Sequence, residues 1–585
     1  MIPNYTPKAV DASMSEAIPT QQLLETLPVP PFMGSNSWVI GPKKTKTGKV
    51  IFSNDTHIGF SQPSAWYEAY VEYPGYQFYG YFLGGIPFPV LGHNEFQAVG
   101  LTMFENDDID LYVERLNPEN ANQVWFKDKW EDMSVRSETI KVKDGEDVNF
   151  EVKISRHGPI INEALEDVGK MTDQPVASWW VFDKFDSQNL QALYGIARAK
   201  DMEMVKEYAA MIHAPGLNLM YGDADGNVAW WTMARLHKRP PHVNSKLFLD
   251  GASGEDEHLG FVDFKDNPHS ENPPEGYVYS ANNQPDTIAG ILHQGYYIPE
   301  DRAKQIIDIL EADNQWDMDK AKAMIVDVRS PKKVANSKKL LRLLANTSIE
   351  GVLATKAIGY LAGWDGDSQL DAIAPTIYTK WNYLIMEKTF KDELGDADFN
   401  TFMMTVLARR SFPFLLDKTN TPWWDDQSTA DKKETQQEIV QAAFKQTLKE
   451  LEAQLGADIT QWQWQKVHTI EHPHLLGQDP NLAKLFNVGP FPVNGNNEVL
   501  NNMAFLPTAD GQYKVKSGPA KRRVIDFSDL DHSVNALPTG QSGNPTSPHY
   551  SDQAEMFVKG AFRLQKTKAS EVKTAKSQLL TLVPK

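Results

Sequence analysis

Apolar and polar positions alternate in short runs over the first half of the chain, which predicts β-strands. The predicted strands are residues 35–41, 49–54, 66–73, 76–84, 96–103, 148–161, 177–182 and 275–281. A hairpin is predicted where Asp225-Gly226-Asn227 separates two apolar runs. Residues 202–211, by contrast, have the spacing of an amphipathic helix. This half of the chain is therefore built mainly of sheets.

The middle of the chain has helical spacing instead. The predicted helices are residues 301–312, 318–326, 336–345, 375–394 and 429–455. Ser428-Thr429-Ala430-Asp431 has the pattern of a capping box for the last helix, and Gly456 is expected to end it. Strand and turn signals return after residue 460. This order of strands, helices and strands predicts an α+β protein with a helical insertion.

The composition narrows the classes of function. The 585 residues are too many for one ordinary core, and the net charge of −19 disfavours nucleic acid or an anionic membrane as a partner. The absence of cysteine excludes disulfides, thiolate catalysis and zinc–thiolate sites. No apolar run is long enough to span a bilayer, and the first residues show no signal peptide. We therefore expect neither a nucleic-acid nor a membrane partner.

The step from Gly34 to Ser35 stands before the first predicted strand. By itself it is typical of a turn. If the peptide bond between the two residues is cut, Ser35 becomes a chain terminus with a hydroxyl nucleophile and a free α-amine. An ordinary α-amine has a pKa of about 8, so it can accept the hydroxyl proton as a general base. Gly34 favours the cut because it has no side chain to obstruct the serine.

Five stretches of the sequence resemble the penicillin acylase family of N-terminal-nucleophile (Ntn) hydrolases. They are residues 34–57, 92–110, 276–302, 489–498 and 540–550, in the same order as in the family. The matching residues include Asn54-Asp55-Thr56-His57, Ala281-Asn282-Asn283-Gln284-Pro285 and Gly495-Asn496-Asn497-Glu498. The resemblance implies an αββα four-layer sandwich, a precursor that cuts itself into an α-chain, a spacer and a β-chain, and a periplasmic or secreted location.

The resemblance also implies a division of the chain. The expected parts are the α-chain end and spacer at 1–34, the first part of the sandwich at 35–300, a mainly helical region at 301–456, the return to the sandwich at 457–564 and a polar tail at 565–585. The rest of the α-chain is expected as a separate partner from the same precursor. Because that chain contributes to the acyl pocket in the family, activity is expected to require it.

Five residues receive catalytic roles from the resemblance. Ser35 is the expected nucleophile, cut free from Gly34. The Asn282 side-chain amide and the Met103 backbone N–H are the expected donors to the oxyanion. His57 is expected to hydrogen-bond the Ser35 amine, and Arg302 to orient Asn282. The alternatives are structural: a turn serine, a strand-end asparagine and histidine, and a surface arginine at a helix start.

The acyl side of the substrate is expected to be aliphatic. Where family members that cleave phenylacetyl groups have two phenylalanines, this chain has Ile58 and Leu91, with Met103 also lining the pocket by resemblance. The expected substrates are amides such as penicillins or N-acyl-homoserine lactones. His93, Asn94 and His549 are weaker candidates, and His472 and His474 are discarded as metal ligands.

A calcium ion is the one cofactor that the resemblance implies. Asp107, Asp108 and Asp110 form a cluster of hard oxygen ligands, and the family's ligands correspond to Asp107, Asp110 and the Ile109 carbonyl. The stretch 288–291 offers no matching carboxylate. Without the resemblance the cluster is a solvated acidic turn.

Three hypotheses about function follow. The first is an N-terminal serine amidohydrolase. The second is a non-catalytic β-chain that acts only as a binding or assembly partner of an α-chain. The third is a calcium-binding structural protein.

Overall fold

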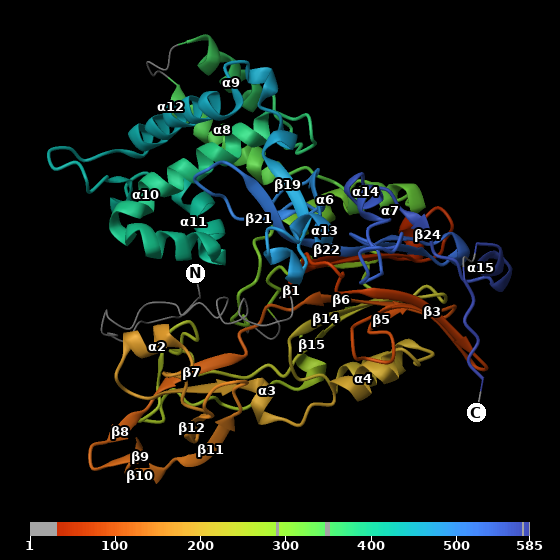
Figure 1. The fold of residues 1–585 in the computed structure, drawn as a ribbon, viewed down its shortest axis with the longest axis horizontal. Helices are drawn as coiled ribbons and strands as arrows, with labels where there is room; N and C mark the ends of the chain where they lie inside the picture. Colours follow the sequence, from red (N-terminus) through yellow and green to blue (C-terminus); the bar gives the residue numbers. More distant parts are fainter. Residues whose placement is uncertain (1–31, 288–291, 346–350, 576–577, 584–585) are drawn as a thin grey trace.

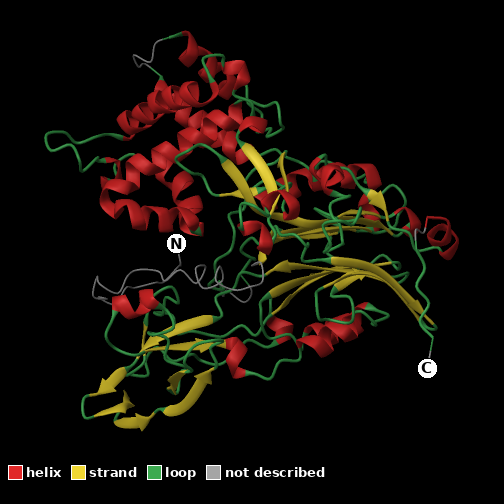
Figure 2. Ribbon diagram, in the orientation of Figure 1, coloured by secondary structure: helices red, strands yellow, loops and turns green. Residues whose placement is uncertain are grey.

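The computed structural model describes residues 32–287, 292–345, 351–575 and 578–583. Most of the predicted spacer, residues 1–31, and the stretch 288–291 lie outside these ranges. Two β-sheets lie face to face near the centre of the molecule, and helices cover the outer face of each (Figure 1). Figure 2 shows a mainly helical part above these sheets on the left and a small strand-rich part below them.

The first central sheet has nine strands and contains the start of the described chain. Its main path is β18 (Tyr277–Ser280), β1 (Phe32–Ile40), β2 (Ile51–Gly59), β22 (Tyr513–Asp526), β19 (His468–His472) and β20 (Val488–Pro492). Three short strands extend it around β22, namely β21 (Ala504–Phe505), β23 (Val534–Ala536) and β24 (Arg563–Leu564). Strands from both ends of the chain thus meet in one sheet.

The second central sheet has seven strands. Their order is β17 (His269–Glu271), β15 (Val228–Met233), β14 (Leu217–Asp223), β6 (Gln97–Met103), β5 (Leu91–His93), β4 (Tyr76–Phe82) and β3 (Tyr67–Tyr73). Every pairing in it is antiparallel. The predicted hairpin at 225–227 joins β14 to β15 and is confirmed.

Apolar side chains explain the four layers. Val39 and Phe52 of the first sheet pack against Met220 of the second. On its other face, the first sheet packs Trp38 against Ile306, which lies in α6 (Asp301–Glu311), next to α7 (Met318–Ile325). The second sheet packs on α4 (Asn189–Ile196) and α5 (Met202–Ala209). Consecutive residues of β1 are buried because both of its faces are covered.

Two further groups of elements surround the sandwich. The helical group comprises α8 (Pro331–Leu344), α9 (Val352–Ala362), α10 (Ala374–Met404), α11 (Val406–Leu416) and α12 (Gln436–Leu455). The strand-rich group comprises β7 (Ile109–Val113), β8 (Arg115–Asn117), β9 (Asn120–Phe126), β10 (Lys129–Asp132), β11 (Ser134–Ile140), β12 (Val148–Ile154), α2 (Glu166–Met171), β13 (Val176–Trp180), α3 (Val181–Lys184) and β16 (Leu249–Asp250). Short helices α13 (Ala483–Phe486), α14 (Ala554–Val558) and α15 (Ala569–Ala575) complete the described chain.

The structure corrects several predicted boundaries. The last long helix begins at Gln436, and its capping box is formed by Thr435 and Glu438 rather than by 428–431. Ser428 instead donates its hydroxyl to Asp426 within the preceding loop, because a local turn competes with the helix start. Helices α9 and α11 and strands β8 to β11 were not predicted. The strand predicted at 148–161 ends at 154.

Within the described ranges, none of the helices combines the length and the apolar character needed to cross a lipid bilayer.

Candidate active site

Ser35 lies inside β1, where the chain runs through Gly34 and Ser35 as one strand. Strand alternation puts Ser35 on the same face as Val39, between the two sheets. The Ser35 hydroxyl donates a hydrogen bond to the Gly34 carbonyl oxygen. Gly34 has a φ of +134°, which favours glycine, and a Cβ there would lie 2.9 Å from Asn282 Oδ1. The hydroxyl therefore already touches the carbonyl group of the preceding peptide bond.

Asn282 joins Ser35 to the second sheet. Its Oδ1 accepts a hydrogen bond from the Ser35 N–H at 2.7 Å, and its Nδ2 donates to the Met103 carbonyl oxygen at 2.9 Å. Asn282 follows β18 with a φ of +63°, a region in which asparagine is favoured over most side chains. The contact made by Met103, at the end of β6, is through its carbonyl oxygen, so the role of its N–H stays a prediction.

Arg302 binds the same group from α6. Its Nη1 donates to the Ser35 carbonyl oxygen at 2.8 Å and to Asn36 Oδ1 at 2.6 Å, and its Nη2 donates to Asn282 Oδ1 at 3.0 Å. Only 1% of its surface is exposed, so it is not the surface arginine of the structural alternative. A planar guanidinium presents its donors to these three acceptors in a fixed, forked geometry.

Acidic groups balance the charge of this arginine. Glu498 Oε2 lies 3.7 Å from Arg302 Nε, and Glu498 Oε1 accepts from Arg409 of α11 at 3.1 Å. Burial raises the pKa of Glu105 to about 7, although Arg302 and Arg409 oppose the shift. Arg409 thus connects the helical group to the Glu498–Arg302 pair.

His57 lies on the opposite face of the strand pair from Ser35. Its Nε2 is 3.3 Å from Asp55 Oδ2, and Asp55 in turn accepts from the Asn36 N–H. Asn502 Nδ2 is 3.3 Å from His57 Nδ1. The predicted hydrogen bond to the Ser35 amine stays a prediction, and the ring contacts found here are with Asp55, Asn36 and Asn502.

The hydrogen-bond network selects the His57 tautomer. The Glu498 N–H donates to Asn502 Oδ1 at 3.2 Å, which leaves Asn502 Nδ2 to donate to His57 Nδ1. Nε2 then carries the ring proton and faces Asp55. Burial lowers the pKa of His57, with Asp55 acting in the opposite direction. The ring is therefore neutral near pH 7.

Ile58 and Leu91 lie in the same apolar cluster, each with 1% of its surface exposed. Trp66, Phe78 and Tyr81 belong to this cluster as well. Ile58 follows Thr56 by two residues, so both side chains lie on the face of β2 that Ser35 shares in β1. The two predicted pocket residues are thus brought together in aliphatic and aromatic surroundings.

The predicted calcium residues Asp107, Ile109 and Asp110 open the strand-rich group, but their partners are cationic or hydroxyl donors. Asp110 accepts from Arg239 Nε at 3.0 and 3.1 Å, and the Asp107 carbonyl oxygen accepts from Arg239 Nη2 at 2.9 Å. Among the residues that the structure describes, no three His, Asp or Glu side chains converge as a metal site. The donor set does not fit calcium, which takes six to eight oxygens.

The weaker candidates have partners of their own. His93 is buried and stacks on Tyr79, and burial lowers its pKa to about 3. Asn94 Oδ1 accepts the N–H groups of residues 96 and 97. His549 pairs with Asp552 on the surface. The His472 ring packs edge to face against Phe60, and burial lowers its pKa to about 4. His474 accepts a backbone N–H. Each contact is the kind expected of a structural residue.

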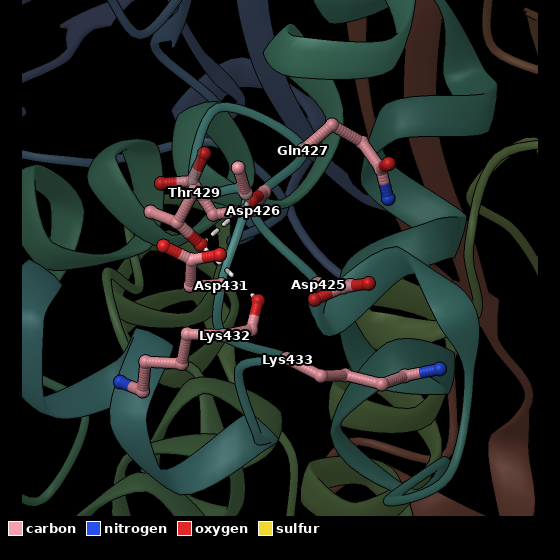
Figure 3. A pocket seen from close by; sticks show the side chains of 8 residues that line it. Asp425, Asp426, Gln427, Thr429, Asp431, Lys432 and Lys433 are labelled. Atoms are coloured by element: carbon pink, nitrogen blue, oxygen red, sulfur yellow. Dashed lines mark hydrogen bonds between the residues drawn. The ribbon is translucent and has the colours of Figure 1, made fainter.

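Two hollows among the described residues differ in their distance from the site. One, of about 390 Å³, is lined by a single loop, 425–433, in which Lys432 and Lys433 extend in opposite directions (Figure 3). The other, of about 360 Å³, lies along β18 and β17 and includes Asn218 and Trp230. Asn218 Nδ2 donates to the Met103 carbonyl oxygen at 3.0 Å, so this hollow borders the site.

Sequence reasoning assigned no role to several residues around Ser35. Asn36 links Arg302 to the Leu500 carbonyl oxygen, which its Nδ2 contacts at 2.8 Å. Asn218 supports the end of β6. The sequence offered weak signals for two of these residues, because Asn36 is adjacent to the nucleophile and Glu498 is the last residue of one matching stretch. Asn218 gave no signal, since it lies beside an ordinary predicted hairpin.

Comparison with known proteins agrees with this arrangement of layers. A solved structure of a thermostable penicillin G acylase from Alcaligenes faecalis superposes with a TM-score of 0.69 at 19% identity, covering 94% of this chain and all of that one. The predicted fold class, an α+β protein of the Ntn-hydrolase type, is therefore confirmed.

Sequence comparison is more specific. The penicillin amidase family model matches residues 4–574, so the chain belongs to this family. It is 28% identical over 569 residues to the acyl-homoserine lactone acylase QuiP of Pseudomonas aeruginosa, and 26% identical over 532 residues to the penicillin acylase 2 proenzyme of Pseudomonas sp. SE83. These matches cover 90% and 89% of this chain, but 66% and 65% of the relatives. The chain thus spans about two thirds of their length.

Proposed function

We propose that this chain is the catalytic part of an N-terminal serine amidohydrolase that removes an aliphatic acyl group from an amide. The observation that carries the proposal is the set of contacts around Ser35. Its nitrogen is held by Asn282 at 2.7 Å, its carbonyl oxygen by Arg302 at 2.8 Å, and its hydroxyl by the Gly34 carbonyl. A turn serine needs no such support.

The first step is cleavage of the chain before Ser35. The Ser35 oxygen adds to the Gly34 carbonyl carbon, and the C–N bond between the two residues breaks. The hydroxyl proton passes to the nitrogen, which becomes the free α-amine. Water then hydrolyses the ester on the Ser35 oxygen, which releases the Gly34 carboxylate and restores the hydroxyl.

The freed serine then acts on the substrate amide. Its α-amine takes the hydroxyl proton as the oxygen attacks the acyl carbon, and it returns the proton to the leaving amine. The Asn282 Nδ2 and the Met103 N–H stabilise the oxyanion of each tetrahedral intermediate. Asn282 holds the amine through its other atom, Oδ1, so one side chain serves both positions. Water completes the cycle by releasing the acid from the acyl-enzyme.

The substrate class follows from the relatives and from the pocket residues. The relatives are named as acylases of acyl-homoserine lactones and of penicillins. The aliphatic side chains of Ile58 and Leu91 favour a linear or branched acyl chain over an aryl one. We further propose that the part of the relatives beyond this chain's match acts as a companion chain and completes the acyl pocket.

Intact mass and amide hydrolysis together test the proposal. The chain is expressed alone and with a segment equivalent to the unmatched third of its relatives, and a series of N-acyl-homoserine lactones and penicillins is supplied. We expect a product that begins at Ser35 and hydrolyses aliphatic amides. A chain that stays whole with the companion segment present would refute the proposal and leave the non-catalytic β-chain.

Gly34→Ala is expected to slow the cleavage by at least about tenfold. A φ of +134° costs an alanine about 1 to 3 kcal/mol, and its Cβ would lie 2.9 Å from Asn282 Oδ1. A time course of intact mass measures the rate. Gly84→Ala, where a Cβ meets nothing within 4 Å, is the matched control. Equal rates for both variants would contradict the role of Gly34.

Replacing both Ile58 and Leu91 by phenylalanine is expected to lower kcat/KM for long aliphatic acyl chains by roughly tenfold or more relative to phenylacetyl amides. Larger rings fill the space that a flexible chain would occupy. Rates across an acyl-length series measure the shift. Ile196→Phe, in the same apolar cluster but on α4, is the control for overpacking. The pocket assignment is wrong if both variants keep the original preference.

A further inference from the structure

The Arg239 side chain contacts the acidic turn that connects β6 to β7. Its Nε donates to both carboxylate oxygens of Asp110, at 3.0 and 3.1 Å. Its Nη2 donates to the Asp107 carbonyl oxygen at 2.9 Å and lies 3.9 Å from Asp107 Oδ1. One guanidinium thus bridges the two aspartates that the family resemblance assigned to calcium.

A histidine and a serine add further contacts to the two carboxylates. His237 Nε2 lies 3.1 Å from Asp110 Oδ2, and Ser245 donates its hydroxyl to Asp107 Oδ2 at 2.7 Å. The two aspartates are 5% and 1% exposed. Buried carboxylates need a compensating cation or several donors, and here both are supplied by the chain.

Charge and space both disfavour a metal ion in the same place. Calcium binds oxygen ligands at 2.3–2.6 Å, and a cation among these oxygens would face the positively charged guanidinium at close range. Lys246 adds a second positive charge, because its Nζ donates to the Gly295 carbonyl oxygen nearby and acts on Asp107. The buried hydrogen bond between His237 and Asp110 restricts the rotation of both side chains.

We propose that the Arg239 guanidinium takes the place of the family's structural calcium, so that the protein carries its cation in its own chain and neither binds nor requires calcium at Asp107 and Asp110. This inference goes beyond the proposed function and does not depend on it.

The contacts show what this cation stabilises. The Asp107 N–H donates to the Gln294 carbonyl oxygen at 3.1 Å, and Gln294 Oε1 accepts from the Ser245 backbone N–H at 3.0 Å. The same segment reaches the Asn282 carbonyl oxygen through the Ile298 N–H at 2.9 Å. Arg239 therefore stabilises two segments that border the site, the chain after Met103 and the chain after Asn282. Arg239 itself lies some 130 residues after Asp110 in the sequence.

The unaltered protein provides the first test. We expect the same thermal midpoint, Tm, in excess EDTA and in millimolar CaCl2, and no heat of binding when Ca²⁺ is titrated into chelator-treated protein. A Tm that rises with Ca²⁺ concentration, or one Ca²⁺ bound per chain that is lost in Asp110→Asn, would overturn the proposal. Neither readout involves the Ser35 chemistry, so the result stands whether or not the chain hydrolyses amides.

Arg239→Ala provides the second test, because it removes the cation and leaves room for an ion. We expect its Tm to fall by roughly 5 to 10 °C in EDTA, since two buried carboxylates lose their partner. Millimolar CaCl2, but not MgCl2, should restore part of this loss. A variant as stable as the unaltered protein, or one equally destabilised with and without calcium, would contradict the replacement.

Two further variants serve as controls, one for loss of a surface charge and one for failure to fold. Arg136→Gln removes an exposed arginine of the same strand-rich group, which pairs with Glu138 on the surface, and should leave Tm unchanged. If Arg239→Ala fails to fold, Arg239→Lys is measured instead. It keeps the charge but loses the forked geometry, so we expect a smaller fall in Tm and still no response to calcium. A calcium response in the lysine variant would count against the proposal.

Discussion

Ser35→Ala is expected to leave the peptide bond after Gly34 intact and to reduce amide hydrolysis about 10⁴- to 10⁶-fold. The hydroxyl is the nucleophile for both reactions in the proposed mechanism, and no other hydroxyl is placed to replace it at the Gly34 carbonyl among the contacts described. Intact mass reports the first reaction, and release of the free acid from an aliphatic amide reports the second.

Ser37→Ala is the matched control for this variant. Ser37 lies two residues further along β1, on the same face and equally buried, and its hydroxyl donates to the Ser53 carbonyl oxygen at 2.8 Å. Its loss removes one buried hydrogen bond, which costs about 1 kcal/mol of stability, but should leave cleavage complete. Cleavage of the Ser35→Ala chain at the same bond, or loss of activity in both variants, would refute the role of Ser35.

Asn282→Ala is expected to lower kcat about 10²- to 10³-fold with little change in KM. Its Nδ2 is a proposed oxyanion donor, and a donor of this kind contributes mainly in the transition state. The same variant loses the Oδ1 that accepts from Ser35 and Arg302, so cleavage of the precursor should slow as well. Single-turnover kinetics and the intact-mass time course separate the two effects.

A control for Asn282→Ala must also replace an asparagine that has a positive φ, because alanine is disfavoured in that backbone conformation. Asn272 also has a positive φ, of 47°, and its Oδ1 accepts the Val228 N–H at 2.9 Å, in a loop beside β17. Asn272→Ala should therefore lose stability but keep kcat. If the two variants lost the same fraction of kcat at equal folded concentration, the effect at Asn282 would be one of folding, and the oxyanion role would be wrong.

Local patterns predicted a large part of the fold. The apolar run Trp38-Val39-Ile40 predicted a strand, and all three residues are fully buried in β1. The strands predicted at 76–84 and 96–103 correspond to β4 and β6. The same holds for the hairpin at 225–227. The predicted start of α12 was less accurate. The polar stretch that begins at Ser428 has a pattern like that of the true N-cap, Thr435, which lies seven residues later.

The sequence by itself determined the family, the inner strand with Gly34 and Ser35, and the asparagine that follows β18, since these depend on short runs of residues. Only the tertiary structure decided which groups meet. It put His57 on the face of β2 away from Ser35, and it brought Arg239 onto Asp110 across 129 positions, where the pattern of aspartates predicted a calcium ion. A short acidic motif specifies the need for a cation, but long-range packing specifies which cation is supplied.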